Sequence, residues 1–170
     1  TETFTYTAEV LTGAHTVVVS PNGKAVYVAC RYYVVVLQRD VESGLLTYSS
    51  VVYLSAVSMD ISPDNQYMYV SERGRESEET RLLQIPLSKE MRFEYGMKTI
   101  RDTFDSPTSL TVSSDSVYVT YGQNLRWYNR NVSHAQLTQL SDVNWSPVNG
   151  SSNGVGGASS VVVSPDNKHV

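Results

Sequence analysis

The stretch SPNGKAVYV at residues 20–28 is repeated along the chain. It returns as SPDNQYMYV at residues 62–70 and, in shortened form, as SSDSVYV at residues 113–119. A fourth copy, SPDNKHV, occupies residues 164–170. The copies begin 42, 51 and 51 residues apart. This spacing is close to the period of roughly 40–50 residues that is typical of proteins built from repeated four-stranded sheets.

Each repeat divides into four short strands. In the first unit we expect strands over residues 15–20, 24–30, 33–38 and 45–52. The tripeptide Pro21-Asn22-Gly23 has the composition of a tight turn between the first two strands. The first strand carries three consecutive valines, and residues 161–163 are also three valines. Consecutive apolar residues indicate a strand that is covered on both faces.

A second motif repeats with the same period and marks the fourth strand. FTYT at residues 4–7 corresponds to LTYS at 46–49, FEYG at 93–96 and LTQL at 137–140. Residues 1–12 are therefore predicted to be the last strand of a preceding unit. The complete units are expected at 13–54, 55–103 and 104–145, followed by a loop and the start of a truncated unit at 146–170.

Together these patterns predict an all-β fold, a segment of a β-propeller with about three to four four-stranded antiparallel blades in an incomplete ring. A single sheet of four strands cannot cover both of its faces, so each blade needs a neighbour. A β-sandwich also has short strands and regular turns, but it does not require the same turn to return at a fixed spacing. Because Val170 falls inside a predicted strand, we expect a piece of a longer polypeptide.

The composition excludes several classes of function. The chain has 170 residues and a net charge of −4, which argues against nucleic acid as a partner. No apolar run is long enough for a membrane span. The histidines at 15, 134 and 169 and the single Cys30 do not have the spacing of metal ligands. We expect no metal and no cofactor.

Three Asn-x-Ser sequons lie close together, at Asn131, Asn144 and Asn149. Pro147 follows the second sequon and is expected to weaken it as a glycosylation site. The clustering favours an extracellular or cell-surface glycoprotein.

The repeated sequence motifs resemble those of a known family. The SPNGKAVYV motif, followed by SGLLT at residues 43–47, resembles the lactonase-type seven-bladed propellers. That family includes 6-phosphogluconolactonase-like proteins and fungal carboxymuconate lactonizing enzymes, and the YVTN surface-layer propellers use similar words. The segment YVSERGRES at 69–77 is similar to a strand-ending motif of the family, with Glu72 in place of the usual asparagine.

The resemblance implies a site at the mouth of the central channel, formed by His15, Arg31, Glu72 and Arg73. Two arginines could hold a carboxylate or stabilise an enolate-like oxyanion, while a histidine or glutamate moves a proton. Structural roles remain open for each residue, since His15 could only form a hydrogen bond and the arginines could stack on tyrosines or pair with Glu72. The third unit has Tyr121-Gly122 where an arginine would be needed.

Two functions follow from these observations. The first is an extracellular or cell-surface propeller that acts as an interaction or structural scaffold. Its partners would be other protein chains or the remainder of the propeller, with a glycan as a further possibility. The alternative is a lactone-processing enzyme, a lactonase or a relative of the lactonizing cycloisomerases, with its site at the channel mouth. The absence of a complete catalytic set favours the first function, and the family resemblance favours the second.

Overall fold

The computed structural model describes residues 11–73, 80–94, 96–104, 106–122, 124–131, 136–144, 159–164 and 166–170. For residues 101–104 and 141–144 it describes the backbone only. The described residues form twelve strands. The predicted strand at residues 1–12 lies almost wholly outside these ranges, and all of the loop at 146–158 does.

The twelve strands form three antiparallel sheets, each with its strands in sequence order. The first sheet contains β1 (Thr16–Val19), β2 (Ala25–Ala29), β3 (Tyr33–Arg39) and β4 (Leu46–Tyr53). The second contains β5 (Ala56–Ile61), β6 (Tyr67–Arg73), β7 (Thr80–Pro86) and β8 (Lys98–Phe104). The third contains β9 (Pro107–Val112), β10 (Ser116–Tyr121), β11 (Asn124–Asn131) and β12 (Gln136–Asn144).

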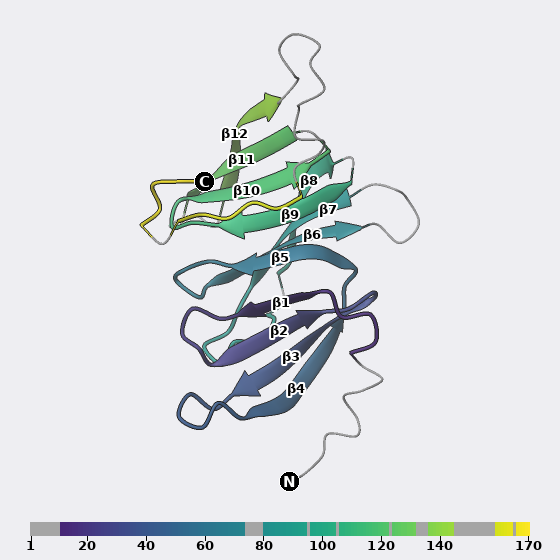
Figure 1. Cartoon of the computed structure of the whole chain (residues 1–170), viewed down its shortest axis with the longest axis vertical. Coiled ribbons are helices and arrows are strands. Elements are labelled where there is room, and N and C mark those ends of the chain that lie inside the picture. Colours follow the sequence, from purple (N-terminus) through teal and green to yellow (C-terminus); the bar gives the residue numbers. More distant parts are fainter. Residues whose placement is uncertain are drawn as a thin grey trace.

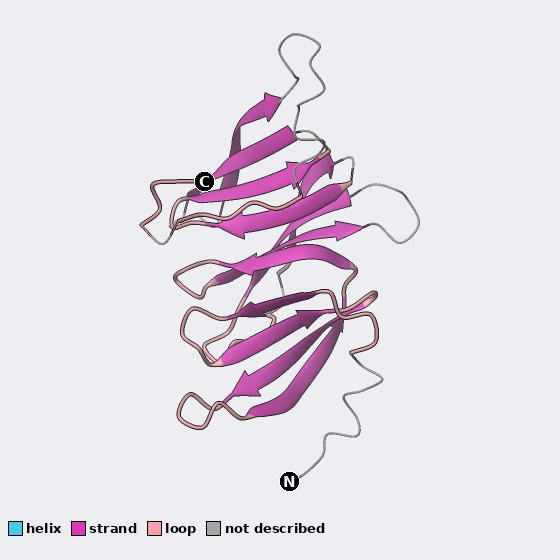
Figure 2. Ribbon diagram, in the orientation of Figure 1, coloured by secondary structure: helices cyan, strands magenta, loops and turns pink. Residues whose placement is uncertain are grey.

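The sheets are stacked face to face along the long axis of the molecule (Figure 1). The first strand of each sheet contacts the first strand of the next, β1 with β5 and β5 with β9. Nearly all the described chain outside these strands is turn and loop (Figure 2). This arrangement is that of propeller blades, and the three described sheets do not close into a ring. The predicted fold class is therefore confirmed.

The repeated serine organises the turn between the first two strands of each unit. Its hydroxyl donates a hydrogen bond to the side-chain oxygen two residues later, which fixes the turn. The four pairs are Ser20–Asn22 (2.8 Å), Ser62–Asp64 (2.6 Å), Ser113–Asp115 (2.9 Å) and Ser164–Asp166 (2.5 Å). The fourth copy of the motif therefore forms the same side-chain hydrogen bond as the first three.

The next residue of the full-length turns has a left-handed backbone. The φ angle is 71° at Gly23, 59° at Asn65 and 57° at Asn167. Glycine and asparagine adopt this conformation with less strain than other residues, so the Gly or Asn of the motif is explained by the backbone it must form.

Apolar side chains fill the space between neighbouring sheets. Along β2, Ala25, Tyr27 and Ala29 pack with residues of the second sheet in one core cluster. The alternate residues Val26 and Val28 belong to a separate cluster on the opposite face of the first sheet. A further cluster joins the second and third sheets. The first and second sheets thus each have two apolar faces, as stacked blades require.

Polar side chains also tie the second sheet to the third. Asp60 of β5 accepts hydrogen bonds from the backbone N–H of Val112 (2.9 Å) and the hydroxyl of Thr111 (3.1 Å), both on β9. Burial raises the pKa of Asp60, and these bonds partly oppose that effect. Ser58 accepts a further bond from the N–H of Leu110 (3.0 Å). Val161 donates in the same way to Ser109 (3.3 Å), so residues 159–164 follow β9 as β9 follows β5.

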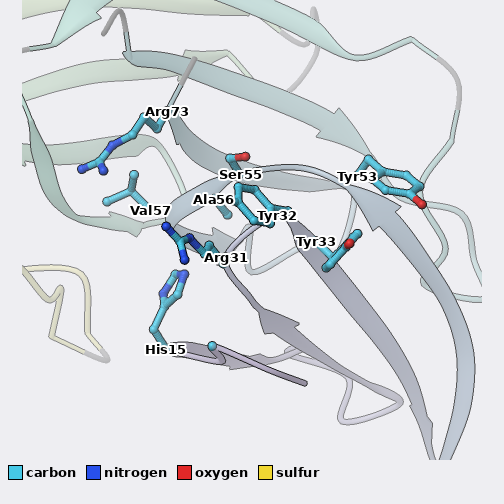
Figure 3. Close-up of a pocket in the computed structure, with 10 residues that line it drawn as sticks. His15, Arg31, Tyr32, Tyr33, Tyr53, Ser55, Ala56, Val57 and Arg73 are labelled. Carbon is cyan, nitrogen blue, oxygen red and sulfur yellow. The ribbon is translucent and has the colours of Figure 1, made fainter. Parts of the chain in front are cut away.

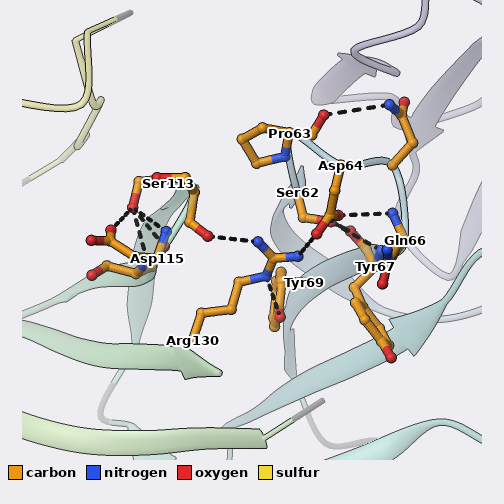
Figure 4. A network of polar contacts seen from close by, with 12 residues as sticks. Ser62, Pro63, Asp64, Gln66, Tyr67, Tyr69, Ser113, Asp115 and Arg130 are labelled. Carbon is orange, nitrogen blue, oxygen red and sulfur yellow. Dashed lines mark hydrogen bonds and ion pairs between the residues drawn. The ribbon is translucent and has the colours of Figure 1, made fainter. Parts of the chain in front are cut away.

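Two tyrosines of the repeated YV pair reach across to the following sheet. The hydroxyl of Tyr27 donates to the backbone oxygen of Met91, in the connection between β7 and β8. Tyr69 holds the equivalent position in the second sheet and accepts a hydrogen bond from Arg130 Nε (3.2 Å) (Figure 4). Burial raises the pKa of Tyr27 well above its usual range and that of Tyr69 to about 12.

Candidate functional site

An open pocket of about 890 Å³ lies where the first and second sheets meet. It is at the end of the sheets that carries the β2–β3 and β4–β5 connections (Figure 3). Ten described residues line it: Gly13, His15, Arg31, Tyr32, Tyr33, Tyr53, Ser55, Ala56, Val57 and Arg73. Three of the four residues predicted from the family resemblance are in this set.

His15 directly precedes β1 and is exposed. Its backbone N–H donates to the oxygen of Ala29 (3.0 Å), which fixes the residue beside the end of β2. Its Nδ1 lies 3.1 Å from the Thr16 hydroxyl. This contact leaves Nε2 available to a ligand, and the imidazole points toward Arg31 (Figure 3).

Arg31 lies in the tight connection between β2 and β3. The connection is closed by a bond from the Cys30 N–H to the Tyr33 oxygen (2.7 Å). The Arg31 guanidinium lies 5.3 Å from the centre of the Tyr32 ring, within the range of a cation–π interaction. Gly13 approaches the arginine closely, since a Cβ added there would lie 3.5 Å from Arg31 Cβ.

Arg73 is the last residue of β6, and its N–H donates to the oxygen of Ser55 (3.0 Å). Both Arg31 and Arg73 are exposed, and among the described residues neither is paired with a carboxylate. Two exposed guanidinium groups and one imidazole therefore line the same pocket. Such a set is suited to binding an anion.

Glu72 does not join the other three residues. Successive side chains of a strand point to opposite faces, so Glu72 and Arg73 diverge. In the sheet, Glu72 is opposite Ala56 on one side and Arg81 on the other. It is not among the described residues that line the pocket. The lining set consequently contains no carboxylate that could act as a general base.

Tyrosines form one wall of the pocket. The rings of Tyr33 and Tyr53 meet edge to face with their centres 5.1 Å apart, and Tyr32 meets Tyr33 at 6.4 Å. Sequence reasoning did not select Tyr53, although residues 53–55 follow the predicted fourth strand at 45–52 and lead to the next first strand, and so belong to the same class of connection as the predicted site. Counting every such connection would have found it.

A further arginine lies at the corresponding end of the third sheet. Arg126 Nη2 donates to the hydroxyl of Tyr121 (3.1 Å), and its guanidinium lies 5.0 Å from the centre of that ring. Tyr121 is where the family pattern would need an arginine. The guanidinium of Arg126, which belongs to β11, lies beside Tyr121 instead. The repeated motifs do not include position 126.

The remaining predicted positions are described only in part. Asn131 ends β11, but the other two residues of its sequon lie outside the described ranges. Asn144 ends β12 with only its backbone described, and Asn149 lies outside. Cys30 is buried, and burial raises the pKa of its thiol. Among the described residues there is no cluster of three or more metal-ligating side chains and no helix that could cross a membrane.

The fold and the comparisons with solved structures define the chain as a β-propeller segment. The sequence matches no protein-family model and no curated protein sequence. The structure is similar to a periplasmic gluconolactonase from Pseudomonas aeruginosa, with a TM-score of 0.61 and 17% identity over 78% of this chain and 40% of that one.

Two other solved structures are similar to this chain over a comparable part of their length. A candidate 6-phosphogluconolactonase from Bacteroides uniformis has a TM-score of 0.66 and 19% identity over 78% of this chain and 41% of that one. A protein from Lactobacillus plantarum has a TM-score of 0.61 and 20% identity over 76% and 41%. The structural neighbours are lactonase-like seven-bladed propellers, and this chain spans about two fifths of their length.

Proposed function

We propose that the pocket formed by His15, Arg31 and Arg73 binds a lactone or its hydroxy acid, and that the chain is part of a lactone-processing propeller. The observation that carries this proposal is the convergence of two exposed guanidinium groups and an imidazole in one pocket. The fold is that of lactonase-like structures, and this likeness supports the class of ligand.

The proposed chemistry is hydrolysis of the lactone ring. A water molecule attacks the carbonyl carbon, and the negative charge that develops on the carbonyl oxygen is stabilised by the arginines. His15 accepts a proton from the water and returns it to the ring oxygen as the carbon–oxygen bond breaks. The product hydroxy acid carries a carboxylate, which the same guanidinium groups can hold.

The test measures binding and turnover separately. Calorimetric titration with gluconate, using neutral glucose as the comparison, should show binding of the anion alone. Arg31→Ala and Arg73→Ala should each weaken gluconate binding about tenfold or more, as expected when a charged hydrogen-bond donor is lost. His15→Ala should lower the rate of gluconolactone hydrolysis about 10²-fold or more while changing gluconate binding less.

Arg92→Ala is the matched control, because Arg92 is an exposed arginine in the β7–β8 connection, away from the pocket. Its binding and hydrolysis should equal those of the unmodified protein. Hydrolysis that persists in the Arg31→Ala, Arg73→Ala double variant would exclude this pocket as the site.

A second function, an interaction or structural scaffold, is favoured by a different observation. Among the described lining residues there is no carboxylate base, and the tyrosines at the rim are exposed, Tyr32 by 49% and Tyr53 by 71%. An exposed aromatic rim is suited to binding a partner or a glycan. Binding of gluconate or of a partner without any lactone turnover would support this function over the first.

An extracellular or cell-surface location belongs to the same proposal. It is supported by the three sequons, at Asn131, Asn144 and Asn149. Enzymatic removal of N-glycans from the protein isolated from its source should reduce its mass. An unchanged mass would count against glycosylation at these positions.

A further inference from the structure

Two valines of β1 are exposed at positions that are buried in the other first strands. Val17 is 61% exposed, whereas the corresponding Met59 of β5 and Leu110 of β9 are 2% and 4% exposed. The correspondence follows from register, since each of these residues is opposite the valine of the YV pair.

The position two residues later shows the same contrast. Val19 is 52% exposed, against 3% for Ile61 and 8% for Val112. Ile61 and Val112 are buried because the preceding sheet packs on them, as Met59 and Leu110 are. The face of the first sheet that contains Val17 and Val19 is therefore built like the covered faces of the other two sheets.

Arg39 lies on the same face, and its contacts can be compared with those of Arg130 on the covered face of the third sheet. Arg39 ends β3, and its backbone N–H donates to the oxygen of Lys24 (2.8 Å). Arg130 makes the same bond to Asp115 (2.6 Å). Each guanidinium also donates from Nη1 to a carbonyl of the first turn of its own sheet, Arg39 to Gly23 (3.1 Å) and Arg130 to Ser114 (2.8 Å).

Arg130 has partners on the preceding sheet, namely Asp64 in its first turn and Tyr69 in its second strand. The second sheet has no arginine at this position. Leu87 of the second unit stands where Arg39 and Arg130 stand, as its N–H bond to the Gln66 oxygen shows. The first turn that precedes it carries the neutral Asn22 rather than an aspartate. The first turn of a sheet is thus acidic where the following sheet has an arginine, and neutral where the following sheet has a leucine.

We propose that another four-stranded blade of the same polypeptide covers this face of the first sheet. This blade presents to Arg39 an aspartate from its first turn and, five residues later, a tyrosine from its second strand. Charge complementarity, the exposed valines and the continuity of the stack identify the occupant as a blade of this repeat.

A second copy of the chain is a poorer occupant. It would have to bring its third sheet, with Asp115 and Tyr118, against Arg39. The N–H of Val161 already donates to Ser109 of that sheet, in the place that Val17 of the incoming copy would take. The lactonase-like neighbours are single chains more than twice as long as the part that this chain matches, which favours blades of the same polypeptide.

The encoded sequence before Thr1 provides the first test. At a spacing of about 40–50 residues before Asn22, it should contain a turn aspartate followed five residues later by a tyrosine. An apolar or basic residue in place of that aspartate, or no further blade, would overturn the proposal.

The second test measures thermal unfolding of the complete polypeptide. Arg39→Ala should lower the Tm by roughly as much as Arg130→Ala, about 5–10 °C. Combining Arg39→Ala with removal of the upstream aspartate should give less than the sum of the two effects. Arg39→Lys should recover part of the loss, because lysine keeps the charge but lacks the planar fork.

Arg92→Ala again serves as the control and should leave the Tm nearly unchanged. An Arg39→Ala effect as small as that of Arg92→Ala would overturn the proposal. So would self-association of the polypeptide that depends on Arg39, because the occupant would then be a second copy. Neither measurement depends on the lactone site, so the two proposals stand or fall separately.

Discussion

Arg130 of β11 forms an ion pair with Asp64, which precedes it by 66 residues in the sequence and lies in the first turn of the neighbouring sheet (Figure 4). The Arg130 side chain is 3% exposed and that of Asp64 is 26% exposed. The same guanidinium bonds to Tyr69 and to the Ser114 carbonyl. One buried charge therefore holds two blades together at the end opposite the candidate pocket.

Replacing Arg130 by alanine should destabilise the protein by about 3 kcal/mol. The change removes the partner of Asp64 and leaves the Ser114 carbonyl without its donor, which costs more than the ion pair itself contributes. Urea denaturation of Arg130→Ala measures the loss. Arg92→Ala, at an exposed arginine, should change the free energy of unfolding by less than about 0.5 kcal/mol. Equal effects of the two substitutions would contradict this role for Arg130.

The stability that Asp64 provides should decline in acid. Burial opposes its ionisation, but hydrogen bonds from Ser62, Gln66 and Arg130 together lower its pKa. Its contribution is complete above the unfolded pKa of about 3.9 and is lost as the pH falls through the lower folded value. The difference in free energy of unfolding between the unmodified protein and Asp64→Asn should therefore shrink from pH 6 to pH 3. Asp60 is present in both proteins, so its own titration cancels in this difference. A difference that stays constant would show that the carboxylate charge is unimportant.

Asp60→Ala should destabilise the contact between the second and third sheets by about 2–3 kcal/mol. The substitution removes the acceptor of the Val112 N–H and of the Thr111 hydroxyl. Asp60→Asn should cost less, because both donors bond to the same oxygen, Oδ2, and an amide oxygen in its place can still accept from them. Chemical denaturation of both variants gives the comparison. Hydrogen exchange at Val112 should speed up more than at Val28, in the first sheet. Equal acceleration at both amides would mean that Asp60 does not act at this contact.

The left-handed residue of the first turn should tolerate asparagine but not alanine. Gly23 has a φ of 71°, and a Cβ there would meet its nearest neighbour, Arg39 Nη1, at an ordinary 3.5 Å. The cost of Gly23→Ala is therefore one of backbone conformation, about 1–2 kcal/mol. Gly23→Asn should cost less than Gly23→Ala, since Asn65 and Asn167 adopt this backbone in the other turns. Thermal unfolding of the two variants tests the order, and an equal loss in both would point to a steric cause.

The sequence predicted the blades well because the signals involved are local. Ser20 and Asn22 close their turn without help from the rest of the chain, and the alternation of Val26, Tyr27 and Val28 sets which side chains face each neighbour. The site was predicted less completely. The resemblance selected His15, Arg31 and Arg73, which the structure brings together, but it also selected Glu72, which points away from them because it is adjacent to Arg73 in a strand.

The order of the strands, their turns and the stacking of apolar sheets follow from the repeated residues themselves, because each depends on neighbours a few positions apart and on a period that recurs. The pairing of Arg130 with Asp64, the bond from Asp60 to β9 and the tyrosine wall beside Arg31 depend on distances between residues of different strands and sheets. Those distances exist only after the sheets have packed, since no local pattern specifies which charge in one blade meets which turn in another.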